Sequence, residues 1–170
     1  PETGTLSLAI KALGDHTRKL PQLLHVGQEI TVEGPYGKFD FSPAATVDGE
    51  KAPQIWVAGG IGVTPFIARL RERIAGSAPG GETDFFYCTA QAGAYPENLE
   101  SLCEQAGVRL HRRLTDTQGP LPSDEIRSRL RPGTSVWFCG PGAWGEALAA
   151  GLIGNGLPRD AFHREAFEFR

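Results

Sequence analysis

The feature that most constrains the fold is a short apolar run that leads through three glycines into an amphipathic segment. Residues 54–58 are typical of a buried strand, and residues 64–75 carry apolar side chains at helical spacing. Gly59, Gly60 and Gly62 lie between them. Glycine permits tight turns and close approach of a ligand, and the start of a helix presents unpaired N–H groups with partial positive charge. This strand, glycine turn and helix together predict a phosphate or pyrophosphate site.

The glycine spacing departs from the complete dinucleotide-binding fingerprint at one position. The segment reads Gly60-x-Gly62-x-x-Pro65, with proline in place of the last glycine of G-x-G-x-x-G. Proline fits the first turn of a helix, because an N–H group there has no partner in any case. A structural bend without a ligand is the alternative, and the flanking strand and helix favour the nucleotide site.

The C-terminal part of the sequence alternates between strand and helix patterns. Predicted strands cover residues 54–58, 83–89, 108–113 and 135–139, and predicted helices cover residues 64–75, 96–106, 123–130 and 144–154, with a last strand near residue 161. This alternation predicts an α/β fold with a parallel sheet flanked by helices. A second glycine turn, Gly140-Pro141-Gly142, follows the strand 135–139. Because ligands bind beyond the carboxyl ends of such strands, we expect both turns to border one crevice.

The N-terminal part has a different rhythm. Residues 5–11 and 27–33 alternate apolar and polar side chains, as half-buried strands do, and a short helix is expected over residues 18–24. These elements predict part of an antiparallel β-barrel. Residues 48–53 form a polar linker. We therefore expect two domains, a partial barrel over residues 1–47 and a nucleotide-binding domain over residues 54–170.

Composition excludes several functions. The 170-residue chain has a net charge of −3 and no basic tract, which argues against nucleic-acid binding. No stretch has the length of a membrane span, and no signal peptide is present. Three widely spaced cysteines and four scattered histidines show neither disulfide nor metal-ligand spacing, so no metal site is expected. The absence of methionine and the turn-like start Pro1-Glu2-Thr3-Gly4 indicate a fragment of a longer protein.

Five motifs in order resemble the ferredoxin–NADP reductase superfamily, and within it the ferric reductase and NADPH oxidase-like branch. They are Gly14-Asp15-His16-Thr17, Glu33-Gly34-Pro35-Tyr36-Gly37-Lys38-Phe39, Gly59-Gly60-Ile61-Gly62-Val63-Thr64-Pro65, Cys139-Gly140-Pro141 and Glu165-Ala166-Phe167. The resemblance implies a flavin-binding barrel followed by a nucleotide domain, with NADP or NAD and FAD as cofactors. Residues 1–47 resemble only the C-terminal half of the barrel, and the family's Arg-x-Tyr/Phe-Ser/Thr flavin motif is missing from this sequence. We therefore expect the fragment to be incomplete as an enzyme.

The resemblance also implies roles for individual residues. The group assigned to the NAD(P) pyrophosphate comprises Gly59, Gly60, Gly62, Val63, Thr64 and Pro65. The group assigned to the flavin diphosphate comprises Gly14, His16 and Thr17. Cys139, Gly140 and Pro141 would lie where nicotinamide approaches the flavin, and Glu165 and Phe167 match an acid-x-aromatic ending whose ring covers the flavin. The predicted catalytic group is therefore Cys139, Glu165 and Phe167.

Each of these roles has a structural alternative. Cys139 is equally explained as a buried cysteine at a strand end, and Thr17 as a helix N-cap. The C-terminal phenylalanines are equally explained as core residues of a terminal strand.

The choice between NADH and NADPH stays open. An acidic residue at the end of the second strand would bind the ribose hydroxyls of NAD, and residues 87–91 contain none. This favours NADPH, with Thr89, Arg112 or Arg113 as candidate contacts to its 2′-phosphate. The alternative for the two arginines is a solvated strand end.

The predicted function is the NAD(P)H-binding portion of a flavin-dependent oxidoreductase. Hydride would pass from NADPH or NADH to FAD, and electrons would then reach an acceptor such as ferric iron or haem. The expected partners are NAD(P)H, FAD, the other half of the flavin barrel and, by the resemblance, a membrane haem domain of the same polypeptide. The piece would then face the cytoplasm. Two alternatives remain: a soluble NAD(P)H:flavin or ferredoxin-type reductase, and a non-catalytic NAD(P)-sensing module.

Overall fold

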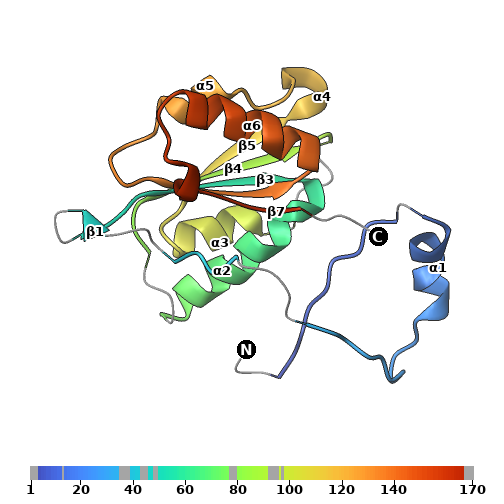
Figure 1. Ribbon diagram of the computed structural model, residues 1–170. Coiled ribbons are helices and arrows are strands. Elements are labelled where there is room, and N and C mark those ends of the chain that lie inside the picture. Colours follow the sequence, from blue (N-terminus) through green and yellow to red (C-terminus); the bar gives the residue numbers. More distant parts are fainter. Residues whose placement is uncertain are drawn as a thin grey trace. The chain divides into compact units, whose positions relative to one another are not determined.

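A five-stranded parallel sheet occupies the centre of the C-terminal part of the chain (Figure 1). Its strands, in spatial order, are β5 (Arg109–Leu114), β4 (Thr83–Thr89), β3 (Gln54–Gly59), β6 (Ser135–Gly140) and β7 (Phe162–Ala166). All four neighbouring pairs run parallel. The prediction of a parallel sheet is therefore confirmed. The chain builds outward from β3 through β4 to β5, and then crosses to β6 on the other side. The point where the order reverses lies between β3 and β6.

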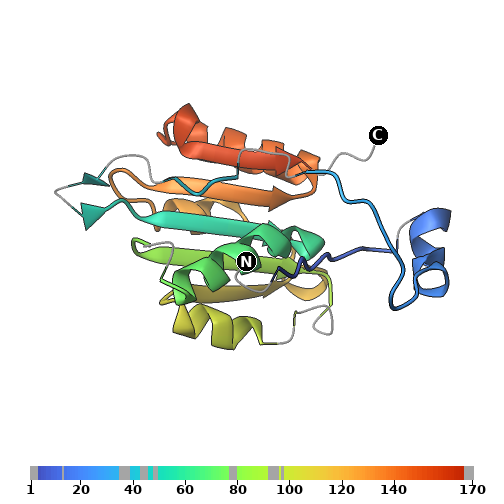
Figure 2. The ribbon, with the colours of Figure 1, turned by 90° about the horizontal axis from the view of Figure 1, so that it is seen from below.

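Helices cover both faces of this sheet (Figure 2). One face carries α2 (Thr64–Ile74) and α3 (Leu99–Gln105), which pack against each other. The other face carries α5 (Ser123–Arg127) and α6 (Gly142–Gly154), which also pack together. The short helix α4 (Thr115–Gln118) follows β5. The described residues also include the 3₁₀ turns η1 (Gly60–Val63) and η3 (Arg159–Ala161), and the antiparallel pair of β1 (Thr46–Val47) with β2 (Glu50–Lys51).

The computed structural model describes residues 4–12, 14–34, 39–42, 46–47, 50–76, 80–91, 96 and 98–166. By its contacts the chain divides into two compact units, residues 1–37 and residues 38–170. The sheet and its helices belong to the second unit. Among the described residues, no helix combines the length and the apolar character that crossing a bilayer requires.

The core of the second unit has two layers because each face of the sheet is covered. Every residue of β4 is buried, as expected for a parallel strand with helices on both sides. The layer beneath α2 and α3 contains Trp56, Phe66, Phe85 and Trp137, among others. The layer beneath α5 and α6 contains Val57, Phe86, Phe138, Leu148 and Leu152, among others. This double layer fixes the carboxyl ends of β3 and β6 side by side.

The segment before the predicted linker belongs to this core. Phe39 and Phe41 pack edge to face, with ring centroids 4.8 Å apart, and both contact the ring of Trp137. Phe41 has a φ of 53°, and its carbonyl accepts a hydrogen bond of 3.1 Å from the side-chain amide of Gln54. A positive φ is unfavourable for phenylalanine, so the aromatic packing and the bond from Gln54 hold this conformation.

The first unit contains one helix, α1 (Asp15–Leu23), within its described residues. It begins earlier than the predicted start at residue 18 because Gly14 and Thr17 cap it: the Gly14 N–H donates to the Thr17 hydroxyl at 3.1 Å. No strand is assigned to residues 5–11 and 27–33, where the sequence predicts two strands. A strand requires a neighbouring ladder, and the described residues of this unit supply none. The antiparallel barrel portion is therefore not evident.

Candidate functional site

The carboxyl end of β3 runs directly into a helical turn. The 3₁₀ turn η1 begins at Gly60 and continues without interruption into α2. The N–H of Thr64 donates to the carbonyl of Ile61. The predicted start of the helix at Thr64 is thus confirmed, and the 3₁₀ turn that precedes it was not predicted. The N–H groups without an intrahelical acceptor belong to the first residues of η1, at the glycines themselves.

The three glycines of this turn are required for different reasons. Gly60 has a φ of 55° and open space where a side chain would project. A methyl group on Gly62 would lie 2.7 Å from the carbonyl carbon of Cys139 and closer still to its oxygen. A methyl group on Gly59 would lie 2.9 Å from both Pro141 and the Trp144 ring. Gly59 and Gly62 are therefore packing requirements, and Gly60 is the position at which a ligand has room to approach the backbone.

The second glycine turn lies against the first. β6 ends at Gly140, and α6 starts at Gly142 after Pro141. A side chain on Gly140 would come within 3.2 Å of the backbone nitrogen of Gly59, whereas Gly142 faces open space. The two turns thus interlock at the point where the strand order reverses. The amino ends of η1 and α6 both lie at this edge of the sheet and give it a positive potential.

Cys139 lies beneath this edge. Its side chain is fully buried in the layer under α2 and α3, and burial raises the pKa of its thiol to about 12. The thiol therefore stays protonated at neutral pH and cannot act as a thiolate nucleophile. Among the described residues, no group of His, Cys, Asp or Glu side chains gathers that could hold a metal ion.

The C-terminal strand places one further predicted residue beside this edge. Glu165 on β7 pairs in register with Cys139, and Ala166 pairs with Gly140. Glu165 is half-buried. Phe167, the other member of the predicted catalytic group on this strand, lies outside the described residues.

The predicted flavin-diphosphate residues lie in the first unit. Gly14, His16 and Thr17 surround the start of α1. The Thr17 hydroxyl also donates to the Gly14 carbonyl at 3.2 Å, so its bonds with Gly14 form a reciprocal cap. The interpretation of Thr17 as the N-cap is therefore wrong, because Gly14 is the N-cap and Thr17 lies at the third position of the helix. Helix α1 has no buried residue.

The two arginines considered for a 2′-phosphate are both engaged. Arg113 donates to the carbonyls of Gly119 and Gln118, at 2.9 and 2.8 Å, and to Glu125 at 2.9 Å. Arg112 pairs with Glu100 at 2.5 Å. Thr89, at the end of β4, is buried.

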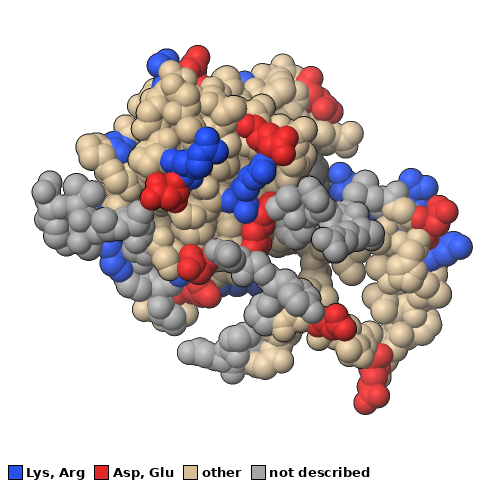
Figure 3. All heavy atoms as spheres, viewed as in Figure 1, with Lys and Arg blue, Asp and Glu red and all other residues tan. Residues whose placement is uncertain are grey.

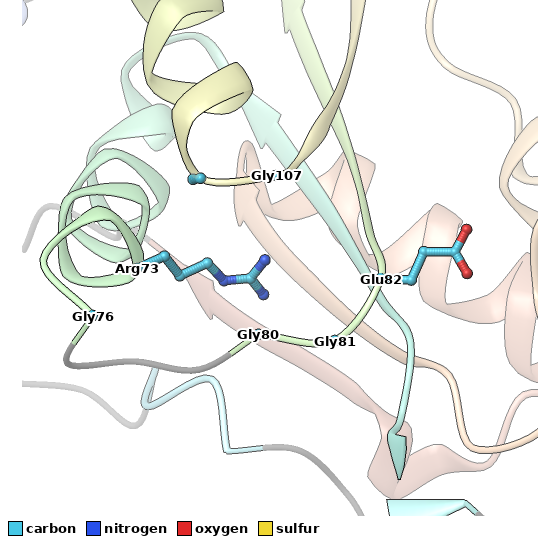
Figure 4. Close-up of a pocket in the computed structure, with 7 residues that line it drawn as sticks. Arg73, Gly76, Gly80, Gly81, Glu82 and Gly107 are labelled. Carbon is cyan, nitrogen blue, oxygen red and sulfur yellow. The ribbon is translucent and has the colours of Figure 1, made fainter.

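Sequence reasoning missed a cavity of about 370 Å³ at the opposite edge of the sheet (Figure 4). Arg73 reaches into it from α2, donates to Thr83 at 2.9 Å and lies 4.6 Å from the centroid of the Trp56 ring. Burial and the nearby Arg69 lower its pKa to about 10, so it remains charged. Gly76 and Gly107, which follow the carboxyl ends of α2 and α3, also line the cavity. Helix carboxyl ends carry partial negative charge, so this cavity lacks the character of a pyrophosphate site.

A charged network missed from the sequence lies near the amino ends of β4 and β5. Asp84 accepts bonds from Arg109 at 2.9 Å and contacts His111 at 2.6 Å. Burial opposes ionisation of Asp84, but these hydrogen bonds outweigh it and lower its pKa to about 2. Glu82 pairs with Arg109 and Arg131. Figure 3 shows that basic and acidic side chains also lie next to one another on the face of the molecule that it presents.

No protein-family model matches the chain. It is similar to the carnitine monooxygenase reductase subunit of Escherichia coli K12, with 28% identity over 153 residues that make up 89% of this chain and 44% of the relative. It is also similar to the heme-dependent oxidative N-demethylase beta subunit of Ectopseudomonas mendocina, with 31% identity over 151 residues, 89% of this chain and 45% of the relative. The chain thus spans less than half the length of these relatives.

Two solved structures place the fold. An intact type IV self-sufficient cytochrome P450 monooxygenase has a TM-score of 0.71 at 26% identity, over 94% of this chain and 19% of that one. The flavohem-like FAD/NAD-binding domain of nitric oxide dioxygenase from Vibrio cholerae has a TM-score of 0.70 at 19% identity, over 89% of this chain and 64% of that one. At this identity the similarity concerns the fold and not the function. The chain contains a ferredoxin reductase-like NAD(P)-binding domain.

In this ferredoxin reductase-like domain, the interlocked glycine turns lie where such folds bind a dinucleotide. The relatives named above are an oxygenase reductase subunit and an N-demethylase subunit. They do not show the resemblance to the ferric reductase and NADPH oxidase-like branch, and the similarity extends to the ferredoxin reductase-like domain.

Proposed function

We propose that this chain is the NAD(P)H-binding portion of an FAD-dependent reductase that passes electrons to an oxygenase or haem partner. The observation that carries the proposal is the interlock of two glycine turns at the reversal point of the sheet, where two helix amino ends meet. The similarity to the carnitine monooxygenase reductase subunit supports the same activity. It favours a reductase component of the ferredoxin-reductase type over the membrane ferric reductase that the sequence first suggested.

The residues of the first turn hold the pyrophosphate. The N–H groups of Gly60 to Gly62 point from the start of η1, and Gly60 leaves room for the phosphate oxygens. Val63, Thr64 and Pro65 continue the chain into α2 and keep these N–H groups in place. NAD(P)H supplies a hydride when bound, and FAD is its acceptor.

The second turn forms the nicotinamide side of the site. Gly140 and Pro141 bring the backbone close to Gly59, and Cys139 shapes the end of β6 as a neutral side chain. Glu165, beside Cys139, and Phe167 contribute the flavin-facing wall. These residues orient two flat rings and exclude water, and none of them needs to form a covalent intermediate.

The first unit contributes to the flavin side. Large apolar residues at alternating positions are exposed there, including Leu6 at 64%, Leu8 at 59% and Ile10 at 55%. We propose that residues 1–47 form the C-terminal half of a flavin barrel, whose other strands belong to the remainder of a longer polypeptide and cover these side chains. Residues 54–170 form the nucleotide domain. Gly14, His16 and Thr17 then present the start of α1 to the flavin diphosphate.

Substitution of Gly142 tests the proposal without disturbing the interlock. Gly142→Asp places a carboxylate at the start of α6, in open space, where an acidic residue suits the helix dipole. We expect it to weaken NADH binding about tenfold by repelling the pyrophosphate. Gly142→Ala adds a methyl group without charge and is expected to bind NADH as the unsubstituted chain does. Equal affinity of the Asp and Ala variants, measured by calorimetry, would contradict the proposed site.

A further inference from the structure

Basic residues are absent from a long stretch around the predicted adenosine end of the site. From Thr83 to Val108 the sequence contains no Lys or Arg. This stretch includes all of β4, the connection that follows it, and all of α3. In dinucleotide folds, the end of the second strand contacts the adenosine ribose. The cations nearest to that end in the sheet therefore come from β5, where Arg112 and Arg113 pair in register with Tyr87 and Cys88.

Arg113 is held in place by three acceptors. Its guanidinium donates to two backbone carbonyls at the carboxyl end of α4 and to Glu125 on α5. Its side chain is only 20% exposed. A charged group with three such bonds would lose all of them on turning toward a ligand, which makes that rearrangement costly.

Arg112 lies on the face of β5 opposite to that of Arg113, and a carboxylate of α3 neutralises its positive charge. Glu100, in the first turn of α3, pairs with it at 2.5 Å. Both side chains are 53% exposed, so this pair is accessible to solvent and to a ligand. A phosphate of about −2 charge that approached Arg112 would meet the carboxylate of Glu100 at the same place. Repulsion between these two negative charges would disfavour NADPH, which carries the 2′-phosphate. It would leave NADH, which lacks that phosphate, unaffected, so a preference arises without any additional contact to NADH.

We infer that the site prefers NADH over NADPH, and that the pairing of Glu100 with Arg112 determines this preference. The inference rests on the proposed function, because it concerns the same dinucleotide site. It reverses the preference for NADPH that the missing acid at residues 87–91 suggested. An acid does face this end of the sheet, but it comes from α3 rather than from the end of β4, and it acts by neutralising the available cation.

The test is a set of eight titrations, with two nucleotides on the chain and on each of three variants. NADH and NADPH are each titrated by calorimetry, first with the unsubstituted chain and then with Glu100→Gln, Glu104→Gln and the double variant Glu100→Gln/Arg112→Gln. Glu104 is the matched control, because it is an exposed carboxylate one turn later on the same helix. An exposed ion pair contributes little to stability, so Glu100→Gln is expected to fold normally.

We expect the unsubstituted chain to bind NADH at least about tenfold more tightly than NADPH. Glu100→Gln should bind NADPH about tenfold more tightly than before and NADH about equally well. The gain should diminish at high salt and disappear in the double variant, and Glu104→Gln should show no gain. NADPH binding as tight as NADH in the unsubstituted chain, or no gain in Glu100→Gln, would overturn the inference alone. Failure of the folded chain to bind either nucleotide would refute the proposed function and this inference together.

Discussion

The substitution Gly62→Ala tests the interlock between the two glycine turns. The added methyl group would lie 2.7 Å from the carbonyl carbon of Cys139 and nearer to its oxygen. Both partners are backbone atoms, and they join the ends of β3 and β6, so neither can move without disturbing the sheet. Overpacking a well-packed core costs about 1–3 kcal/mol, and we expect the upper end of this range here. A loss of about 3 kcal/mol corresponds to a decrease in Tm of roughly 6–12 °C for a domain of this size.

The assay is thermal and urea unfolding of Gly62→Ala beside Gly142→Ala. Gly142 is the first residue of α6. A methyl group added to it would have no atom within 4 Å. Its substitution should change stability by less than about 0.5 kcal/mol. If Gly62→Ala proved as stable as Gly142→Ala, the close approach of the two turns would be wrong, and with it the geometry of the proposed site.

Two further predictions concern buried titratable groups. Asp84→Asn should destabilise the protein by roughly 2 kcal/mol at pH 7, because it removes charge-assisted bonds from Arg109 and His111. The folded-state pKa of Asp84 is lowered to about 2, so its contribution is complete above the ordinary aspartate pKa of about 4 and is lost as the pH falls toward 2. Urea unfolding between pH 2 and 7 should show the two proteins converging in acid, and a constant difference would exclude Asp84 as the cause. Cys88, Cys103 and Cys139 are buried, with thiol pKa values raised to about 12 by burial, and should react with a thiol reagent only after unfolding; rapid reaction of the folded protein would show that this core opens.

Much of the sheet could be predicted because parallel strands covered on both faces have continuous apolar sequences. Residues 54–58, 83–89 and 135–139 show this pattern directly, and each lies within a strand of the structure or coincides with one. The start of the helical turn after β3 could not be predicted in the same way. Proline at position 65 indicated a helix start nearby, but the four residues before α2, Gly60–Val63, form a 3₁₀ turn, which leaves no apolar periodicity in the sequence.

The first unit shows the limit of alternating patterns. Residues 5–11 alternate as a half-buried strand does, but alternation indicates only which side chains share a face. Whether a ladder forms depends on a partner strand, and the described residues of this unit contain none. The pairing of Arg112 with Glu100 was equally hidden, because it depends on how α3 lies against β5 across 12 positions of sequence.

The central claim is that the interlocked glycine turns bind a nicotinamide dinucleotide. The most direct measurement is the change in backbone amide NMR shifts when NADH is added to the isotope-labelled chain. We predict the largest shifts at Gly60, Ile61 and Gly62, with a second group at Gly140 and Gly142. A folded protein whose amides do not shift, or whose shifts gather at Gly76 and Gly107 around the opposite cavity, would contradict the assignment.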